Sequence, residues 1–377
     1  MFYESIAMGD VDNGGKNEVL GTKTRKGSDG TYYEIIFDVY NEVDSDHWER
    51  IKSNGQMEGV KEDQKYKNHE IVVADVDGEP GNEVIMKTHH WLVVYKYSEA
   101  EGDFKKLSST NSFVDGKTVT LESLIIRDID RDGINEILVS ANDEEIENKG
   151  YLLIYQDFSL TEFVIVPINA HLGPSTQYYV ELGNKFRHNS LRVGDLEGDG
   201  SIEICSSGYR KESNVSRMWN DGYSVYSLEG DLYEVYLFMW DSNGNLLHEI
   251  FVYEVHYWGL PTLTFDIGDV DPNHVGNEIA YWFREGTTEK GSSDYEYYKL
   301  TLSYFEESKL NELWRTTTDG GRNLYITDSN GDGENDIVLG GRKNCFYLEI
   351  FDENGDSLWK RLKEEVGEGD VMYIASG

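Results

Sequence analysis

The feature that most constrains this chain is an acidic segment of nine or ten residues that occurs six times. Each copy begins with Asp, carries Asp, Glu or Asn at its third position and, in most copies, at its fifth, and ends with Glu or Asp. The first residues of successive copies lie 53 to 74 residues apart. Self-similarity at such a period is typical of repeat architectures, in which each repeat is one supersecondary unit. The copies, called loops one to six below, are residues 10–18, 75–83, 128–136, 195–203, 269–278 and 328–336.

Short apolar runs flank every loop. Residues 123–127 precede loop three, and residues 136–140 continue from its last position. Runs this short, rich in β-branched residues and bounded by Gly or Asp, predict strands. A third run follows, such as residues 151–155, and in two repeats an Asn-Gly pair at residues 243–244 or 354–355 predicts a tight hairpin to a fourth.

Four strands in a repeat of about 60 residues is the strand count of a β-propeller blade. The predicted fold class is therefore all-β, a propeller of four-stranded antiparallel blades that spans residues 1–377 as a single domain. Six loops indicate six blades. Residues 371–377 resemble residues 4–9, which run into loop one, so the chain stops where a seventh loop would begin. Seven blades, or a longer array of which this chain is a piece, remain the alternative.

Oxygen donors at positions one, three, five and nine of a tight loop suit a hard cation. Ca²⁺ takes six to eight oxygen ligands at about 2.3–2.6 Å and tolerates irregular geometry, whereas Mg²⁺ demands a near-ideal octahedron. An EF-hand differs, because its last ligand is a Glu at position twelve and its flanks are helices. We therefore expect several structural Ca²⁺ ions as cofactors.

These loops resemble the FG-GAP/VCBS repeats of integrin-type and bacterial β-propellers, which bind Ca²⁺ between the first two strands of a blade. The resemblance covers almost the whole chain, although the Phe-Gly and Gly-Ala-Pro marks of the integrin version are absent. Carried over position by position, it implies these ligands: Asp128, Asp130, Asp132 and Glu136; Asp195, Glu197, Asp199 and Glu203; Asp328, Asn330, Asp332 and Asp336; Asp75, Asp77, Glu79 and Glu83; Asp10, Asp12 and Glu18; Asp269, Asp271, Asn273 and Glu278.

Loops three, four and six match the pattern best and are the ones we expect to hold ions. Loop one has Gly14 at position five, so it lacks one ligand. Loop two has Pro80 where Gly is usual, and loop five has one extra residue before Glu278. An acidic turn without a metal is the competing interpretation for these loops, above all for loops one and five.

Charge and hydropathy limit the classes of partner and the location that we expect for this chain. The formal net charge is −37, from 34 basic and 71 acidic residues, so the chain would repel a phosphate backbone and nucleic acid is not expected as a partner. No apolar run is long enough to span a membrane. No signal peptide opens the chain. We expect an extracellular or cell-surface location, with this chain a trimmed piece of a longer protein or a monomer; a cytoplasmic protein is the alternative.

A ligand face is expected opposite the calcium loops, where residues enter the first strand of each repeat. Candidate ligand-binding residues there are His69, Arg187 and His188. A second candidate is residues 208–227, read as a long insertion in the fourth repeat, with Trp219 available to stack on a sugar or grip a peptide. Ordinary loop residues are the competing interpretation for both.

Three functions remain open. The first is a non-catalytic module that binds a carbohydrate or a protein in adhesion. The second is a calcium-dependent polysaccharide lyase, because residues 188–203 are similar to segments of rhamnogalacturonan lyases; Arg187 or His188 would then be the base. The third is a structural module of a larger surface protein. The sequence contains no Gly-x-Ser-x-Gly, His-x-x-x-His or phosphate-binding glycine motif, so no catalytic residue is predicted.

Overall fold

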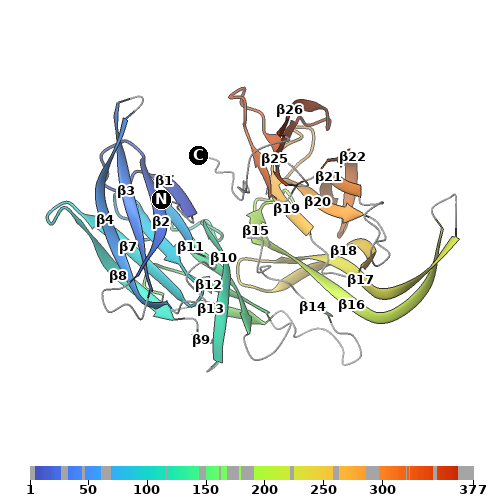
Figure 1. Ribbon diagram of the computed structural model, residues 1–377, viewed down its shortest axis with the longest axis horizontal. Coiled ribbons are helices and arrows are strands. Elements are labelled where there is room, and N and C mark those ends of the chain that lie inside the picture. Colours follow the sequence, from blue (N-terminus) through green and yellow to red (C-terminus); the bar gives the residue numbers. More distant parts are fainter. Residues whose placement is uncertain are drawn as a thin grey trace. The chain divides into compact units, whose positions relative to one another are not determined.

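Every regular element of the computed structural model is a β-strand, and the described residues contain no helix (Figure 1). Those residues are 5–26, 33–44, 47–60, 69–111, 113–114, 117–143, 150–160, 163–167, 178–179, 191–220, 225–257, 263–285, 297–319, 321, 323–342 and 346–363. They form six antiparallel sheets in which, apart from a two-residue strand at Tyr178–Tyr179, each strand pairs with the next one of its sheet along the chain. The predicted all-β class is confirmed, with sheets that are consistent with about six propeller blades. Residues 371–377, which raised the question of a seventh, lie outside the described residues.

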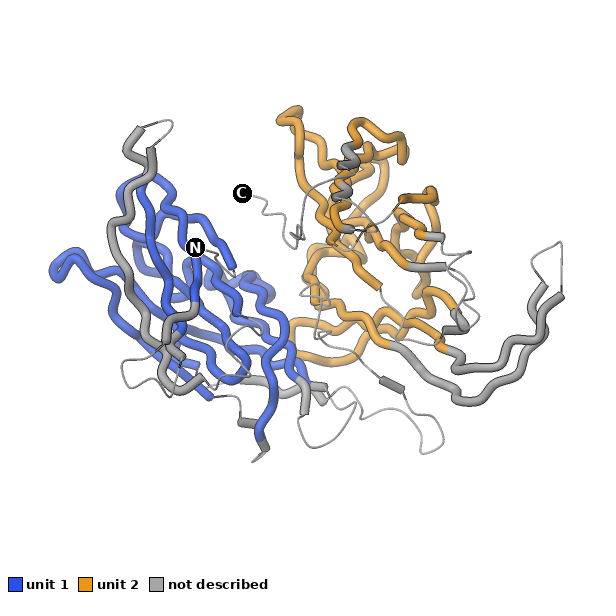
Figure 2. Tube along the Cα trace, in the orientation of Figure 1, with its two compact units in different colours: residues 1–167, 377 blue, residues 168–376 orange. Residues whose placement is uncertain are grey.

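The chain divides into two compact units, residues 1–167 with residue 377, and residues 168–376 (Figure 2). Each unit holds three sheets, so the single domain over residues 1–377 stays a prediction. In the first unit the sheets are β1 (Ser5–Gly9), β2 (Glu18–Lys26), β3 (Tyr33–Asp44) and β4 (His47–Val60); β5 (Glu70–Ala74), β6 (Glu83–Lys87), β7 (Trp91–Ser98) and β8 (Asp103–Asn111); and β10 (Lys117–Arg127), β11 (Glu136–Asp143), β12 (Gly150–Tyr155) and β13 (Phe163–Pro167), with β9 (Phe113–Val114) beside β10.

The second unit repeats this plan. Its sheets are β15 (Leu191–Gly194), β16 (Glu203–Asn220), β17 (Val225–Trp240) and β18 (Leu246–Tyr257), with β14 (Tyr178–Tyr179) also beside β16; β19 (Leu263–Gly268), β20 (Glu278–Glu285), β21 (Tyr297–Glu306) and β22 (Lys309–Thr318); and β23 (Asn323–Thr327), β24 (Asp336–Arg342), β25 (Phe346–Phe351) and β26 (Ser357–Lys363). The insertion expected at residues 208–227 is a β-ribbon in its described part: residues 208–220 extend β16, residues 225–227 begin β17, and the two strands stay paired out to Asn220 and Val225. Residues of high β propensity, such as Val215 and Tyr226, favour the extension of the two strands.

Sheets within a unit pack face to face through their apolar side chains. In β6, Val84 and Met86 pack toward the first sheet and Ile85 toward the third, and none of the three is exposed. Successive side chains of a strand point to opposite faces. A strand buried on both faces therefore reads as a continuous apolar run, which is the pattern that flanks the loops. Trp282 has the same role in the second unit, where it joins the last two sheets.

The first strand of most sheets is an edge, and its free N–H groups need acceptors. In three places a side chain on the first strand of one sheet accepts from the first strand of the next: Ile71 N donates to Ser5 Oγ (3.2 Å), Leu124 N to Glu70 Oε2 (3.1 Å) and Ile326 N to Asp266 Oδ2 (2.8 Å). Charged groups held between sheets need a counter-charge, and Lys87 is fully buried. Lys87 Nζ lies 3.7 Å from Glu70 Oε2, and Arg192 pairs with Asp266.

Close approach of neighbouring sheets explains the glycine that precedes Asp in three loops. A Cβ on Gly9 would lie 2.4 Å from Val73 Cγ1, and one on Gly268 would lie 2.5 Å from Ile326 Cγ2. A Cβ on Gly194 would likewise lie 2.3 Å from Ile267 Cγ2. Each glycine thus lets the first strand of the following sheet pack directly against the start of a loop.

Candidate metal centres

Each acidic loop connects the first and second strands of a sheet. Loop three, for example, leaves β10 after Arg127 and enters β11 at Glu136. In loops one to five the residue at position two anchors the loop, because its apolar side chain is buried in the core; examples are Val76 and Ile129, which are 0% and 2% exposed. Loop six has the exposed Ser329 at this position. The carboxylates therefore start from a rigid corner of the sheet.

The acid at position nine closes each loop. In all six it is buried and accepts the backbone N–H of position two. The bonds are Val11 N to Glu18 Oε2 (2.9 Å), Val76 N to Glu83 Oε2 (2.9 Å), Ile129 N to Glu136 Oε2 (2.8 Å), Leu196 N to Glu203 Oε2 (2.8 Å), Val270 N to Glu278 Oε2 (2.7 Å) and Ser329 N to Asp336 Oδ2 (3.1 Å). In the five Glu loops, one oxygen thus holds the loop, and Oε1 is left for another partner.

Backbone N–H groups turn the acid at position one inward. In loops three, four and six the donor is the glycine at position six, and its bonds are Gly133 N to Asp128 Oδ2 (3.1 Å), Gly200 N to Asp195 Oδ2 (3.0 Å) and Gly333 N to Asp328 Oδ2 (2.9 Å). These glycines have φ between 92° and 94°, which a residue with a Cβ rarely adopts. In loop one, Gly14 N donates to both Asp10 Oδ1 and Asp12 Oδ1 at 2.9 Å, so the residue that removes a ligand also positions two others.

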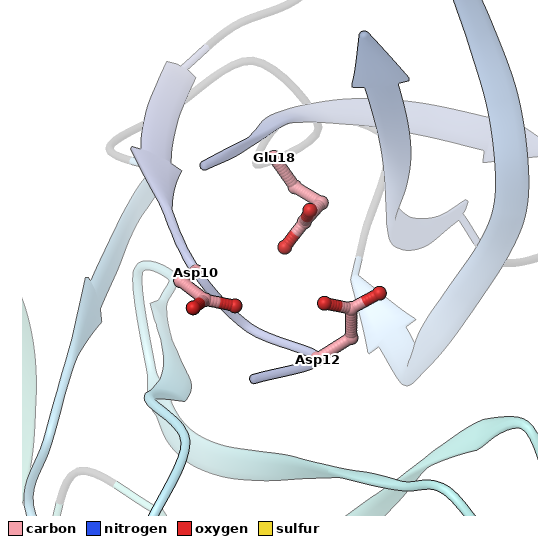
Figure 3. Close-up of side chains that lie close together, drawn as sticks. All are labelled: Asp10, Asp12 and Glu18. Atoms are coloured by element: carbon pink, nitrogen blue, oxygen red, sulfur yellow. The ribbon is translucent and has the colours of Figure 1, made fainter. Parts of the chain in front are cut away.

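Three carboxylates converge in loops one, two and three. Their oxygens lie within 4.8 Å of one another, and Figure 3 shows the three acids of loop one turned toward a common point. The groups are Asp10, Asp12 and Glu18; Asp75, Asp77 and Glu83; and Asp128, Asp130 and Glu136. Within the described residues, no such three-acid group occurs in loops four to six. The sequence therefore did not anticipate that loop one would be among the best formed.

Two buried oxygens strengthen the case for a cation. Asp128 Oδ1 in loop three and Glu278 Oε1 in loop five are buried and accept no hydrogen bond. An anionic oxygen in that position is costly unless a cation lies beside it. Ca²⁺ fits, because it binds carboxylate oxygens in irregular cages.

The other predicted ligands lie in their loops with protein partners of their own. Glu197 Oε1 lies 2.8 Å from His248 Nε2 in loop four, and Asp271 Oδ2 lies 2.9 Å from His274 Nδ1 in loop five. Asn330 Oδ1 accepts from Asp332 N at 2.9 Å in loop six. Their assignment as metal ligands stays a prediction.

Burial raises the pKa of the glutamates that end loops one to five. Desolvation, together with the nearby Asp carboxylates, raises the pKa of Glu136 to about 7. The pKa of Glu203 rises to about 7 for the same main reason. Burial also raises the pKa of Glu18, Glu83 and Glu278. A metal ion would stabilise the ionised form of these carboxylates, so a cation bound there would compete with the proton.

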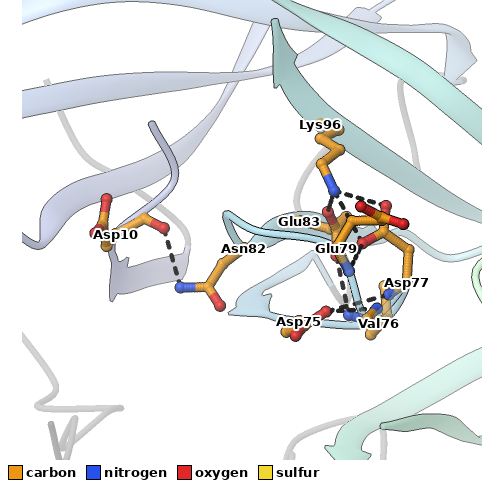
Figure 4. Close-up of polar contacts among 9 residues, drawn as sticks. Asp10, Asp75, Val76, Asp77, Glu79, Asn82, Glu83 and Lys96 are labelled. Carbon is orange, nitrogen blue, oxygen red and sulfur yellow. Dashed lines mark hydrogen bonds and ion pairs between the residues drawn. The ribbon is translucent and has the colours of Figure 1, made fainter. Parts of the chain in front are cut away.

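An asparagine at the penultimate position links successive loops, and the sequence analysis missed it. It bonds the carbonyl oxygen of position one in the preceding loop: Asn82 Nδ2 to Asp10 O (3.0 Å, Figure 4), Asn135 Nδ2 to Asp75 O (2.6 Å) and Asn335 Nδ2 to Asp269 O (2.8 Å). In loop five, Asn277 N donates to Asp195 O at 2.6 Å. Asn before the last acid in five of the six loops was the available signal.

Replacing Asn135 with Ala is expected to lower the free energy of unfolding by about 1 kcal/mol, because it leaves the Asp75 carbonyl without this donor. Urea denaturation in calcium would measure the loss. Asn111→Ala, on an exposed position of β8, is the control and should change the free energy by less than about 0.5 kcal/mol. Equal losses in the two variants would mean that the link between loops does not stabilise the fold.

The structure gives little support to the predicted ligand-binding residues. His69 is buried, with 5% of its surface exposed. Arg187 and His188 lie outside the described residues. Trp219 lies on β16, where it pairs with Tyr226 of β17. A ligand face at these positions stays a prediction. No helix of the described residues is long and apolar enough to cross a membrane.

No protein-family model and no curated protein matches the chain. Among solved structures, a Lactobacillus plantarum protein is 11% identical with a TM-score of 0.48, and the match covers 95% of this chain and 84% of that one. An Agrocybe aegerita lectin, described as recognising non-reducing terminal N-acetylglucosamine, is 13% identical with a TM-score of 0.46, over 95% and 79% of the two chains. A Bacillus licheniformis rhamnogalacturonan lyase is 12% identical with a TM-score of 0.37, over 95% of this chain and 60% of the lyase. Likenesses this distant do not identify the activity of this chain.

Proposed function

We propose that this chain is a calcium-binding repeat module of the β-propeller class, in which the ions hold the corner between the first two strands of a blade. The observation that carries the proposal is the convergence of three carboxylates in loop three, where Asp128 Oδ1 is buried without a hydrogen-bond partner. In the part of the chain that the structure describes, no Lys, Arg or His forms an ion pair with the acids of loops one and three. A divalent cation would supply the missing charge.

Calcium binding to Glu136→Gln tests this proposal. The substitution keeps the shape of the side chain and the acceptor for Ile129 N but removes the charge, so the number of bound Ca²⁺ ions is expected to fall by one. Native mass spectrometry counts the ions. Glu101→Gln, which changes an exposed acid paired with Lys105, is the matched control and should leave the count unchanged. A count that is the same for wild type and Glu136→Gln would contradict a site in loop three.

We further propose that the module binds a glycan or a protein outside the cell or on its surface. Calcium sites of extracellular modules typically have dissociation constants of about 10⁻⁴ to 10⁻³ M, so binding should be tested at millimolar calcium. Glycans that end in N-acetylglucosamine and rhamnogalacturonan are suitable first probes, applied in calcium and in EDTA. Binding without cleavage would support a recognition module. Release of unsaturated sugar products would instead support a lyase.

A further inference from the structure

Loop two differs from loops one and three because a cation of the protein itself already lies in it. Lys96 comes from β7, and its Nζ lies 2.8 Å and 2.7 Å from Asp77 Oδ1 and Oδ2 and 2.9 Å from Glu83 Oε1 (Figure 4). These are the oxygens at positions three and nine that would otherwise face a metal ion. The ammonium group thus contacts three oxygens of a cage that has the same acid convergence as loops one and three.

The register of the sheets explains how a lysine comes to lie in loop two. Val84 pairs with Tyr95, so the next residue, Lys96, stands across from Glu83. In each of the other sheets, the residue after the last acid of the loop also has a partner on the third strand. The residue that follows this partner is the equivalent of Lys96. None of them is basic: Asn41, Gln156, Asp241, Tyr304 and Asp352.

We propose that Lys96 is the built-in cation of loop two, and that this loop is held closed without calcium. A Ca²⁺ ion bound to Asp77 and Glu83 would lie about 2.3–2.6 Å from their oxygens, and the ammonium group is already within 2.9 Å of the same oxygens. The two cations would repel each other at that separation. The ammonium group is tethered to the strand beside the loop, so it is present at any calcium concentration. The inference rests on the proposed function, namely that other loops of this chain bind calcium.

Loop two thereby becomes the calcium-independent corner of the first unit. It lies between loops one and three along the chain and is bonded to both, since Asn82 reaches Asp10 O and Asn135 reaches Asp75 O. A corner that stays formed at low calcium would keep the carbonyl of Asp75 in place for the loop that follows it.

Counting bound Ca²⁺ in matched variants of the full chain tests the inference. Lys96→Gln, which removes the charge from the cage, is expected to bind one more ion than wild type. Lys96→Arg, which keeps a cation there, should bind the same number as wild type. Asp77→Asn should also leave the wild-type count unchanged, whereas Glu136→Gln in loop three lowers it by one. A count lowered by one in Asp77→Asn, or unchanged in Lys96→Gln, would overturn the inference.

Thermal unfolding separates this inference from the proposed function. In EDTA, Lys96→Gln is expected to melt several degrees below wild type, and calcium is expected to recover this difference. A difference that calcium does not recover would show that the ion cannot replace the ammonium group, which also overturns the inference. If wild type, Lys96→Gln and Glu136→Gln all bind no calcium, the proposed function fails. If the number of bound ions is unchanged in Lys96→Gln but falls by one in Glu136→Gln, the inference is overturned and the proposed function stands.

Discussion

Removal of calcium by EDTA is expected to lower the midpoint of thermal unfolding by about 5 °C. At a free concentration ten times Kd, each occupied site adds about 1.4 kcal/mol to the free energy of unfolding, so three sites add about 4 kcal/mol. The entropy of unfolding is about 2.1 cal/mol/K per residue, or about 0.8 kcal/mol/K for 377 residues, so a change of 1 kcal/mol moves the midpoint by about 1.3 °C. The physical reason is that the converging acids, such as Asp128, Asp130 and Glu136, repel one another when no cation lies between them.

Magnesium at the same concentration is the control for this measurement. It should recover little of the lost stability, because the loops offer irregular cages rather than an octahedron of waters and carboxylates. Equal recovery by both metals would point to general screening of the charge of −37. No change on adding EDTA would mean that the loops are acidic turns, and that the ligand assignments are wrong.

The effect of pH on stability is expected to reverse when calcium is present. In EDTA, the free energy of unfolding should fall as the pH rises from about 4.5 to about 7. The folded protein holds protons on Glu136 and Glu203, whose pKa is raised to about 7, while the unfolded chain has already released them. Stability is therefore highest below the unfolded pKa of these groups and is lost as the pH rises through the folded pKa. The expected loss is roughly 3 kcal/mol for each glutamate.

Calcium in excess should abolish this loss, because it favours the ionised carboxylates and binds more tightly as the proton leaves. The gap between the melting temperatures in calcium and in EDTA should then widen from about pH 5 to about pH 8. A variant with both Glu136→Gln and Glu203→Gln removes the titrating groups and is expected to flatten the EDTA curve. Parallel curves in calcium and EDTA would show that these two carboxylates do not exchange protons for metal.

The local parts of this structure could be predicted from the sequence. The apolar runs on each side of loop three became β10 and β11, and the acid at position nine, Glu136, lies at the first residue of β11 as the spacing required. These features depend on residues within about ten positions of one another, through strand propensity, turn glycines and side-chain oxygens. The insertion predicted at residues 208–227 takes the form of a paired ribbon in its described part, a form that could not be predicted because it depends on how two long strands pair.

The contacts between repeats could be seen only in the tertiary structure. Asn135 bonds Asp75 O across 60 positions of the chain, and Gly9 is needed because Val73 packs against it. Nothing in the sequence distinguishes Lys96 from other strand residues. The register of β6 and β7 places it across from Glu83. The sequence by itself determined where the acidic loops and their strands lie, because short-range patterns carry that information. Only the tertiary structure decided which carboxylates converge and which loop already holds a cation, because both depend on side chains that sheet pairing and packing bring together.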